Sequence, residues 1–257
     1  MIFVHGLGGS ARTWDQLRAV AGDGYAGIAV DLLGFGRSPK PADEAYDIDC
    51  HLRHLLPEVP DGAIVVGHSA GALLALALAA RAPERVAGLV LCSLPAYPDA
   101  ETARNEIARL GLVARLTVAD SWAARAMCWI MCRTRWIGIL VAPLFAWRTP
   151  AAVARDALRH TYTSYAGTLR HVIVEHRVTD DFARVTVPMV IVHGRDDDVV
   201  RLGYVREAAP LGPLLMITPG DHYLPIRNPR ACAAALTRVV DAVRGTRGKT
   251  LPEAEPR

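Results

Sequence analysis

The sequence predicts an α/β fold with a mostly parallel sheet of about six strands, helices on both faces of the sheet, and an inserted helical segment. Short, almost continuous apolar runs alternate with longer helical patterns, which is typical of parallel strands joined by crossover helices. These runs lack polar alternation, as expected of strands that helices cover on both faces. The chain has 257 residues, 51% of them hydrophobic, which suits a single domain with an insertion.

Six apolar runs are the candidate strands. Each is rich in leucine or β-branched residues, and most end at Gly, Asp or Ser. In chain order they are Met1–Val4, Gly27–Val30, Ala63–Val66, Gly88–Cys92, Pro188–Val192 and Leu214–Ile217. We therefore expect an α/β core over residues 1–95 and 181–244.

The strand pattern stops between residues 96 and 180. This stretch is expected to form helices, and it holds four of the five tryptophans of the chain: Trp122, Trp129, Trp136 and Trp147. Because a strand pattern resumes after it, the helical segment interrupts one sheet. Residues 245–257 are polar and are expected to form a flexible tail.

Charge and cysteine usage exclude several classes of protein. The formal net charge is +3, and the basic residues are scattered, so we expect no nucleic-acid partner. Five cysteines without a CxxC pair, and no recognisable leader, indicate reduced thiols in the cytoplasm. The most lipid-like run, Trp136 to Trp147, has 12 residues, whereas a membrane span needs about 20. We therefore expect no membrane partner.

The strongest chemical signal is Gly67-His68-Ser69-Ala70-Gly71. It follows an apolar strand and precedes an apolar helical run. A nucleophile elbow needs small residues two places before and after its serine, because the backbone turns sharply there. A serine that only caps the helix is the alternative. A serine hydroxyl also needs a base that a third group orients, so the chain must supply a histidine and a carboxylate.

Several motifs in one order resemble the landmarks of the α/β-hydrolase family. They are HGLGGS, DLLGFGRS, GHSAG, VHGRDDD and GDHYLPIRNP, and the resemblance extends from residue 1 to about residue 244. It implies that Ser69 is the nucleophile, His222 the base and Asp197 the acid. The family's spacing of a glycine followed three places later by the acid is met by Gly194 and Asp197.

Three other carboxylates compete with Asp197 for the role of the acid. Asp196 and Asp198 are its neighbours in VHGRDDD and stay open as alternatives. Asp221 directly precedes His222, and adjacent side chains seldom face each other in a turn, so a turn role is favoured.

The same resemblance implies an oxyanion hole, a lid and no metal or organic cofactor. The oxyanion donors would be the backbone N–H groups of Leu7 and Ala70. In this family the insertion forms a lid over the nucleophile, and its aromatic and aliphatic content implies a small-molecule substrate with apolar bulk. Between residues 97 and 180 eleven arginines face seven acids, which gives a weak hypothesis of an anionic substrate.

The function predicted on this basis is a serine hydrolase that cleaves a carboxylic ester or thioester through an acyl-enzyme. A carbon–carbon bond hydrolase and a cofactor-free cyclase or haloperoxidase-like enzyme are the alternatives that keep the same triad. A ligand-sensing receptor with a retained triad is a further one. An NAD(P)-binding oxidoreductase is weighed because Gly6-Leu7-Gly8-Gly9-Ser10-Ala11 matches a dinucleotide fingerprint, with Asp31 twenty residues later.

Two histidines, His51 and His54, lie three apart on an expected helix. An exposed helical face explains them better than a metal site does, because no further ligand recurs at a useful spacing. His5, His68 and His193 border the motif loops, and we expect them to position or pack against other groups, with contact to a substrate as the alternative.

One departure from the family concerns the start of the sheet. Members usually carry two additional strands before the HG loop, whereas this sequence starts on the strand that leads into that loop. A late start codon and a shortened sheet are the two explanations. In a shortened sheet the strand Gly27–Val30 would be an edge strand, and pairing in a homodimer or coverage by a loop would satisfy its backbone groups. The expected strand order is 4-3-5-6-7-8 in family labels.

Overall fold

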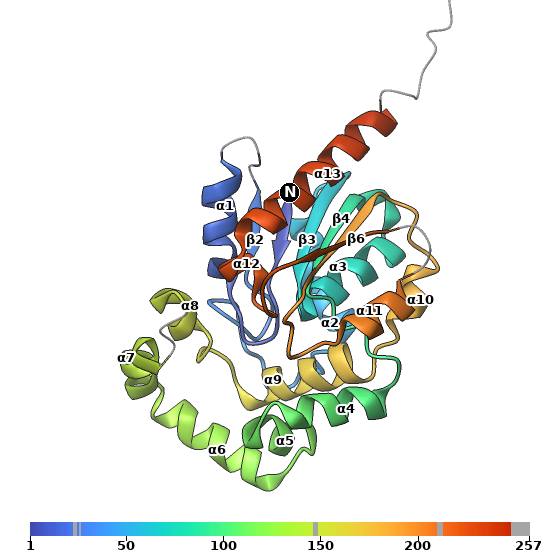
Figure 1. Ribbon diagram of the computed structural model, residues 1–257. Coiled ribbons are helices and arrows are strands. Elements are labelled where there is room, and N and C mark those ends of the chain that lie inside the picture. Colours follow the sequence, from blue (N-terminus) through green and yellow to red (C-terminus); the bar gives the residue numbers. More distant parts are fainter. Residues whose placement is uncertain (23–24, 26, 146–148, 210–212, 248–257) are drawn as a thin grey trace, which may run out of the picture.

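The computed structural model describes residues 1–22, 25, 27–145, 149–209 and 213–247. Its centre is a six-stranded sheet in which every strand pair is parallel (Figure 1). The strands are β1 (Ile2–Val4), β2 (Ile28–Val30), β3 (Ala63–His68), β4 (Val86–Cys92), β5 (Met189–Gly194) and β6 (Leu214–Thr218). Their order is β2-β1-β3-β4-β5-β6, which confirms the predicted order and the α/β class.

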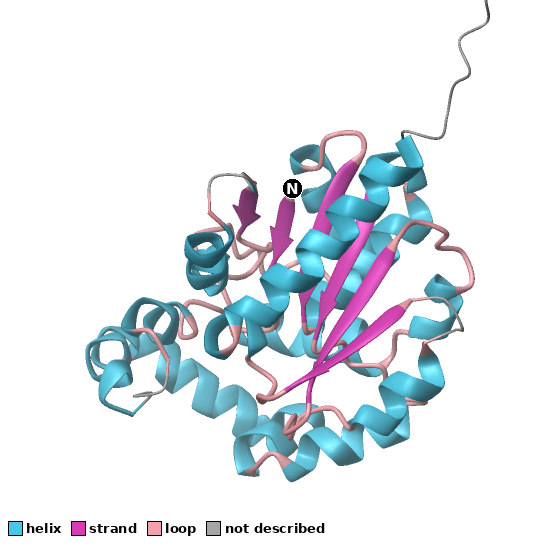
Figure 2. Ribbon diagram, turned by 45° about the horizontal axis from the view of Figure 1, so that its top comes forward, coloured by secondary structure: helices cyan, strands magenta, loops and turns pink. Residues whose placement is uncertain are grey.

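Helices cover both faces of the sheet (Figure 2). On one face α1 (Asp15–Ala21) and α13 (Pro229–Arg247) cover the core around Phe3 and Val90. On the other face lie α2 (Ile48–Leu55), α3 (Ala70–Arg81) and α11 (Leu202–Ala208). Both faces of the central strands are therefore buried from solvent, which explains why the sequence shows continuous apolar runs.

Short helices join these elements. They are η1 (Ala11–Trp14), η3 (Leu56–Glu58), η4 (Pro83–Arg85) and α12 (Leu224–Arg227). The strand β2 forms one edge of the sheet, and Ile28 on it is 52% exposed.

A run of helices connects β4 to β5, where the sequence predicts the insertion. They are α4 (Ala100–Arg109), α5 (Leu112–Val118), α6 (Trp122–Arg133), α7 (Arg135–Phe145), α8 (Ala151–Asp156), α9 (Tyr162–Thr168), η5 (Leu169–Val174, a π-helix) and α10 (Val178–Phe182). Its two ends join the core of the sheet: Ile107 of α4 and Val172 of η5 are buried in the same cluster as α3. Trp147 lies outside the described residues.

The first three residues of the expected tail are helical. Residues 245–247 continue the helix α13, and residues 248–257 lie outside the described part of the chain. The apolar face of α13 carries Val239 and Val243 into the core, and the helix extends beyond that anchor.

Candidate active site

Ser69 stands at the carboxyl end of β3, where the chain turns sharply into α3. Its φ of 52° lies in the left-handed region, which a non-glycine residue enters only where surrounding structure holds it. The Ser69 N–H donates to Cys92 O over 3.0 Å, and the Ser69 carbonyl accepts from the first turn of α3. These bonds hold the strained backbone in place, so that the Ser69 side chain lies at the carboxyl end of the parallel strands.

The two glycines of the motif make this turn possible. A Cβ atom on Gly67 would lie 2.3 Å from Gly71 O, and one on Gly71 would lie 2.2 Å from Val4 O. Both distances are far below van der Waals contact, so no larger residue fits either place. The small positions are thus required by the approach of α3 to β1 and β3.

Ser69, His222 and Asp197 come together although they lie on three separate loops. The distance from Ser69 Oγ to His222 Nε2 is 2.9 Å, and His222 Nδ1 lies 3.0 Å from Asp197 Oδ2. An ionised carboxylate only accepts hydrogen bonds, so Nδ1 of His222 carries the hydrogen and Nε2 is free to accept from the Ser69 hydroxyl. The loops meet because parallel strands present their carboxyl ends at one edge of the sheet.

Asp197 is held as a buried carboxylate. Its side chain is fully buried, and its Oδ1 accepts the N–H groups of Val199 and Val200, each over 2.9 Å. Burial raises the pKa of Asp197, but hydrogen bonding and charge interaction with His222, with help from the Val200 N–H, bring the pKa below its ordinary value. Asp197 is therefore charged at neutral pH.

The competing carboxylates lie elsewhere. Asp196 and Asp198 are exposed, and neither bonds to His222. Asp221 accepts from the Tyr223 N–H over 3.0 Å and forms an ion pair with Arg227, as a turn residue does.

His68 holds the histidine loop in place. It is buried, and its Nε2 lies 2.8 Å from the His222 carbonyl oxygen, to which the neutral ring donates. Burial, the larger cause, and the charge interaction with His222, the smaller one, together lower the pKa of His68 to about 3, so this ring stays uncharged. The sequence predicts a positioning or packing role for His68 but not its partner, because the two residues are 154 positions apart.

The first loop lies directly against Ser69. A Cβ atom on Gly6 would lie 2.9 Å from Ser69 Cβ, and a turn follows in which Gly9 N–H donates to Gly6 O over 3.0 Å. Among the described residues neither the Leu7 nor the Ala70 N–H donates a hydrogen bond. Neither N–H group is therefore committed to an acceptor within the described protein, as the expected oxyanion role requires.

His5 and Asp31 stabilise this loop. His5 Nε2 accepts the Leu32 N–H over 3.0 Å, so its Nδ1 donates to Gly6 O over 2.8 Å. Asp31 accepts the N–H groups of Ala11 and Arg37. Its carboxylate thus joins two loops of the protein and is only 11% exposed, which argues against the dinucleotide interpretation.

His51 differs from the expectation of an exposed helical face. It is completely buried, and its Nε2 lies 2.9 Å from Thr168 Oγ1, which ties α2 to α9. Burial lowers the pKa of His51 to about 4. Sequence spacing misses this contact, because the partner is 117 residues away. Within the described part of the chain no three His, Cys, Asp or Glu side chains gather to hold a metal ion.

Ser10, in the first loop, is a link that the sequence does not reveal. Its hydroxyl donates to Asp156 Oδ2 over 2.9 Å, and Asp156 ends the helix α8. The helical segment is therefore fastened directly to the loop that carries Leu7.

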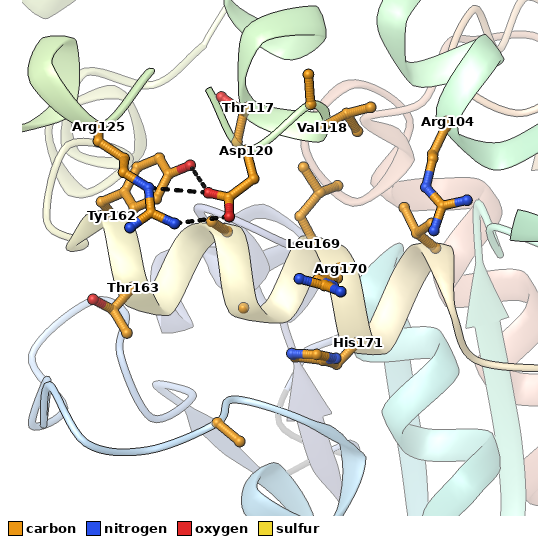
Figure 3. Close-up of a pocket in the computed structure, with 15 residues that line it drawn as sticks. Arg104, Thr117, Val118, Asp120, Arg125, Tyr162, Thr163, Leu169, Arg170 and His171 are labelled. Carbon is orange, nitrogen blue, oxygen red and sulfur yellow. Dashed lines mark hydrogen bonds and ion pairs between the residues drawn. The ribbon is translucent and has the colours of Figure 1, made fainter. Parts of the chain in front are cut away.

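A cavity of about 400 Å³ lies away from Ser69, between α5, α6, α9 and η5. Figure 3 shows Arg125 and Tyr162 both directed to Asp120, which they contact over 2.8 and 2.6 Å. Ser69 does not line it. The cavity is thus separate from the serine site.

Comparison with known proteins shows the family of this chain. Residues 1–235 match the model of the alpha/beta hydrolase family. The chain belongs to the alpha/beta hydrolase family. It is 31% identical over 246 residues to "Probable lysophospholipase BODYGUARD 4" of Arabidopsis thaliana, an alignment that covers 86% of this chain and 59% of the plant protein.

Two further matches cover nearly the whole chain. The "2-(acetamidomethylene)succinate hydrolase" of Mesorhizobium japonicum is 27% identical over 259 residues, covering 94% of this chain and 88% of that protein. A crystal structure of E-2-(acetamidomethylene)succinate hydrolase superposes with a TM-score of 0.72 at 21% identity, covering 94% and 91% of the two chains. That structural likeness supports the fold.

Proposed function

We propose that this protein is a serine hydrolase that cleaves a carboxylic ester or thioester of a partly apolar substrate. The observation that carries the proposal is the contact of 2.9 Å between Ser69 Oγ and His222 Nε2, with His222 Nδ1 oriented by the buried Asp197. This arrangement supplies a nucleophile, a base and an orienting acid.

The reaction takes place in two halves. Ser69 Oγ attacks the carbonyl carbon while His222 Nε2 takes the hydroxyl proton, and the negative oxygen that develops accepts the N–H groups of Leu7 and Ala70. The protonated His222 then gives its proton to the leaving alcohol or thiol. In the second half His222 takes a proton from water, the hydroxide oxygen attacks the acyl-enzyme, and the proton returns to Ser69 as the carboxylic acid leaves.

The helical segment between β4 and β5 is proposed to be a lid over this site. Its α8 is fastened by Asp156 to Ser10 in the oxyanion loop, and Tyr165 of α9 lies 3.5 Å from where a Cβ atom on Gly8 would stand. Substrate size would therefore depend on how α8 and α9 lie over the loop. We propose a cytoplasmic location, which agrees with five unpaired cysteines. No helix in the described residues is long and apolar enough to cross a membrane.

A fluorophosphonate probe tests the proposal. We expect it to add one label to the wild-type protein and none to Ser69→Ala. Ser93→Ala is the matched control, because Ser93 is also buried, stands at the end of β4 and also has a positive φ. The absence of label on folded wild-type protein would contradict the proposal.

Turnover of short p-nitrophenyl esters and of acyl thioesters tests the bond that is cleaved. Hydrolysis that disappears in Ser69→Ala supports the ester or thioester assignment. Labelling without turnover of either substrate would favour the carbon–carbon hydrolase, cyclase or receptor alternatives.

A further inference from the structure

A surface on α6 and α7 exposes an unusual set of tryptophans. Trp122 and Trp129 on α6 are 81% and 61% exposed, and Trp136 on α7 is 70% exposed. Both views place these helices at the periphery of the molecule, away from the sheet (Figures 1 and 2). We define the α6–α7 surface by its exposed apolar side chains: Trp122, Trp129, Ile130, Met131, Trp136, Ile137 and Leu140.

These side chains follow helical spacing within each helix. Trp122 and Trp129 are seven residues apart and share one face of α6, whereas Trp136 and Leu140 are four apart on one face of α7. The chain can bury a tryptophan, since Trp14 is completely buried against Phe3. Large apolar side chains exposed in this number on two consecutive helices mark an interaction surface.

The helices α6 and α7 carry three arginines, Arg125, Arg133 and Arg135, and no aspartate or glutamate. Arg125 is paired with Asp120, which precedes α6. The Arg133 guanidinium lies over the Trp129 ring at 4.9 Å. In the described ranges Arg133 is exposed and forms no ion pair with a carboxylate, whereas Arg135 donates to the His160 carbonyl oxygen over 2.6 Å. The α6–α7 surface is therefore both apolar and cationic.

We propose that the α6–α7 surface binds to the surface of an anionic phospholipid bilayer, independently of the reaction at Ser69. Tryptophan favours the boundary between headgroups and acyl chains, and helices with arginines beside tryptophan and leucine lie in that plane. Arginines would contact lipid phosphates. A second copy of the chain is disfavoured as the occupant, because pairing two such surfaces would bring arginine against arginine.

Binding at the surface of a bilayer differs from the expectation, drawn from the sequence, that the protein has no membrane partner. That expectation considered a helix that crosses the bilayer, for which the run from Trp136 to Trp147 is too short. A helix that lies in the headgroup region needs an amphipathic surface and cationic side chains instead of length.

Sedimentation with vesicles tests the proposal. We expect the full-length protein to sediment with vesicles of phosphatidylglycerol and phosphatidylcholine, to bind pure phosphatidylcholine at least about tenfold more weakly, and to be released by 0.5 M salt. Tryptophan emission should shift to shorter wavelength on binding. Failure to sediment with anionic vesicles, or equal and salt-independent binding to both vesicle types, would overturn the proposal.

Variants separate the surface from general charge effects. We expect Trp129→Ala with Trp136→Ala, and separately Arg133→Glu, to weaken binding to anionic vesicles at least about tenfold. The matched control is Arg18→Glu, an exposed position on α1 with the same change in charge, which should bind as the wild type does. Equal losses in Arg18→Glu and Arg133→Glu would overturn the proposal. So would light scattering that shows a dimer dissociated by the tryptophan variant.

Discussion

Replacing Asp197 by asparagine tests the orientation of His222. The asparagine oxygen can still accept the Val199 and Val200 N–H groups, which Asp197 Oδ1 accepts now over 2.9 Å each. Its NH2 group then faces His222 Nδ1, which must become an acceptor. The hydrogen of the ring moves to Nε2, and Nε2 can no longer take the proton of the Ser69 hydroxyl.

The burial of residue 197 sets the size of the effect. The side chain is fully buried, so water does not replace the lost acceptor. A wrong tautomer in such a triad reduces the rate by roughly 10³ to 10⁴, or about 4 to 5.5 kcal/mol of transition-state stabilisation. The fold should survive, because the backbone donors of the loop keep their acceptor.

The rate of fluorophosphonate labelling at neutral pH measures this effect. Asp198→Asn is the matched control, since that side chain is exposed on the same loop, and it should label at the wild-type rate. If Asp197→Asn labels within tenfold of the wild type while thermal unfolding shows an intact fold, then Asp197 does not orient His222 as the distances indicate.

Two further predictions concern stability. Gly71→Ala should lower the free energy of unfolding in urea by about 3 kcal/mol or more, because its Cβ would lie 2.2 Å from Val4 O. Gly203→Ala in α11 meets no atom within 4 Å and should raise the free energy of unfolding by about 0.5 to 1 kcal/mol. Similar losses of stability in both variants would refute the steric argument. Burial lowers the pKa of His51 to about 4 and of His68 to about 3, from an ordinary value of 6.5. Below pH 6.5 the unfolded chain therefore binds more protons than the folded protein does. As the pH falls from 7 to 5, the free energy of unfolding should decrease by up to about 1.4 kcal/mol per unit of pH for each histidine. His51→Gln should reduce this difference, and an unchanged difference would show that His51 does not contribute.

The strands could be predicted because their signals are local, whereas their order was expected from the resemblance of the motifs to the α/β-hydrolase family. Each strand is an apolar run that burial on both faces requires, and the glycines around Ser69 mark a turn that permits no side chain. The loops that carry Ser69, Asp197 and His222 each follow a strand, so their meeting follows from parallel topology.

Contacts between distant segments could not be predicted. The burial of His51 depends on Thr168, and the fastening of α8 depends on Ser10 and Asp156, which are 146 residues apart. The hydrophobic pattern predicts which face of a helix is buried, but it does not predict which polar side chain of the neighbouring element that face will contact. For the same reason the sequence does not reveal that Trp136, an apolar residue, is 70% exposed.

The glycine at the end of β5 has a consequence for how this protein can change. A Cβ atom on Gly194 would lie 2.4 Å from Gly220 O and 2.7 Å from Asp221 O, so the backbones that precede Asp197 and His222 touch each other. Neither backbone can shift without displacing the other. In protein engineering, segments 194–200 and 218–224 would have to be exchanged between homologues as a single cassette, and a graft of one alone would separate the carboxylate from the imidazole.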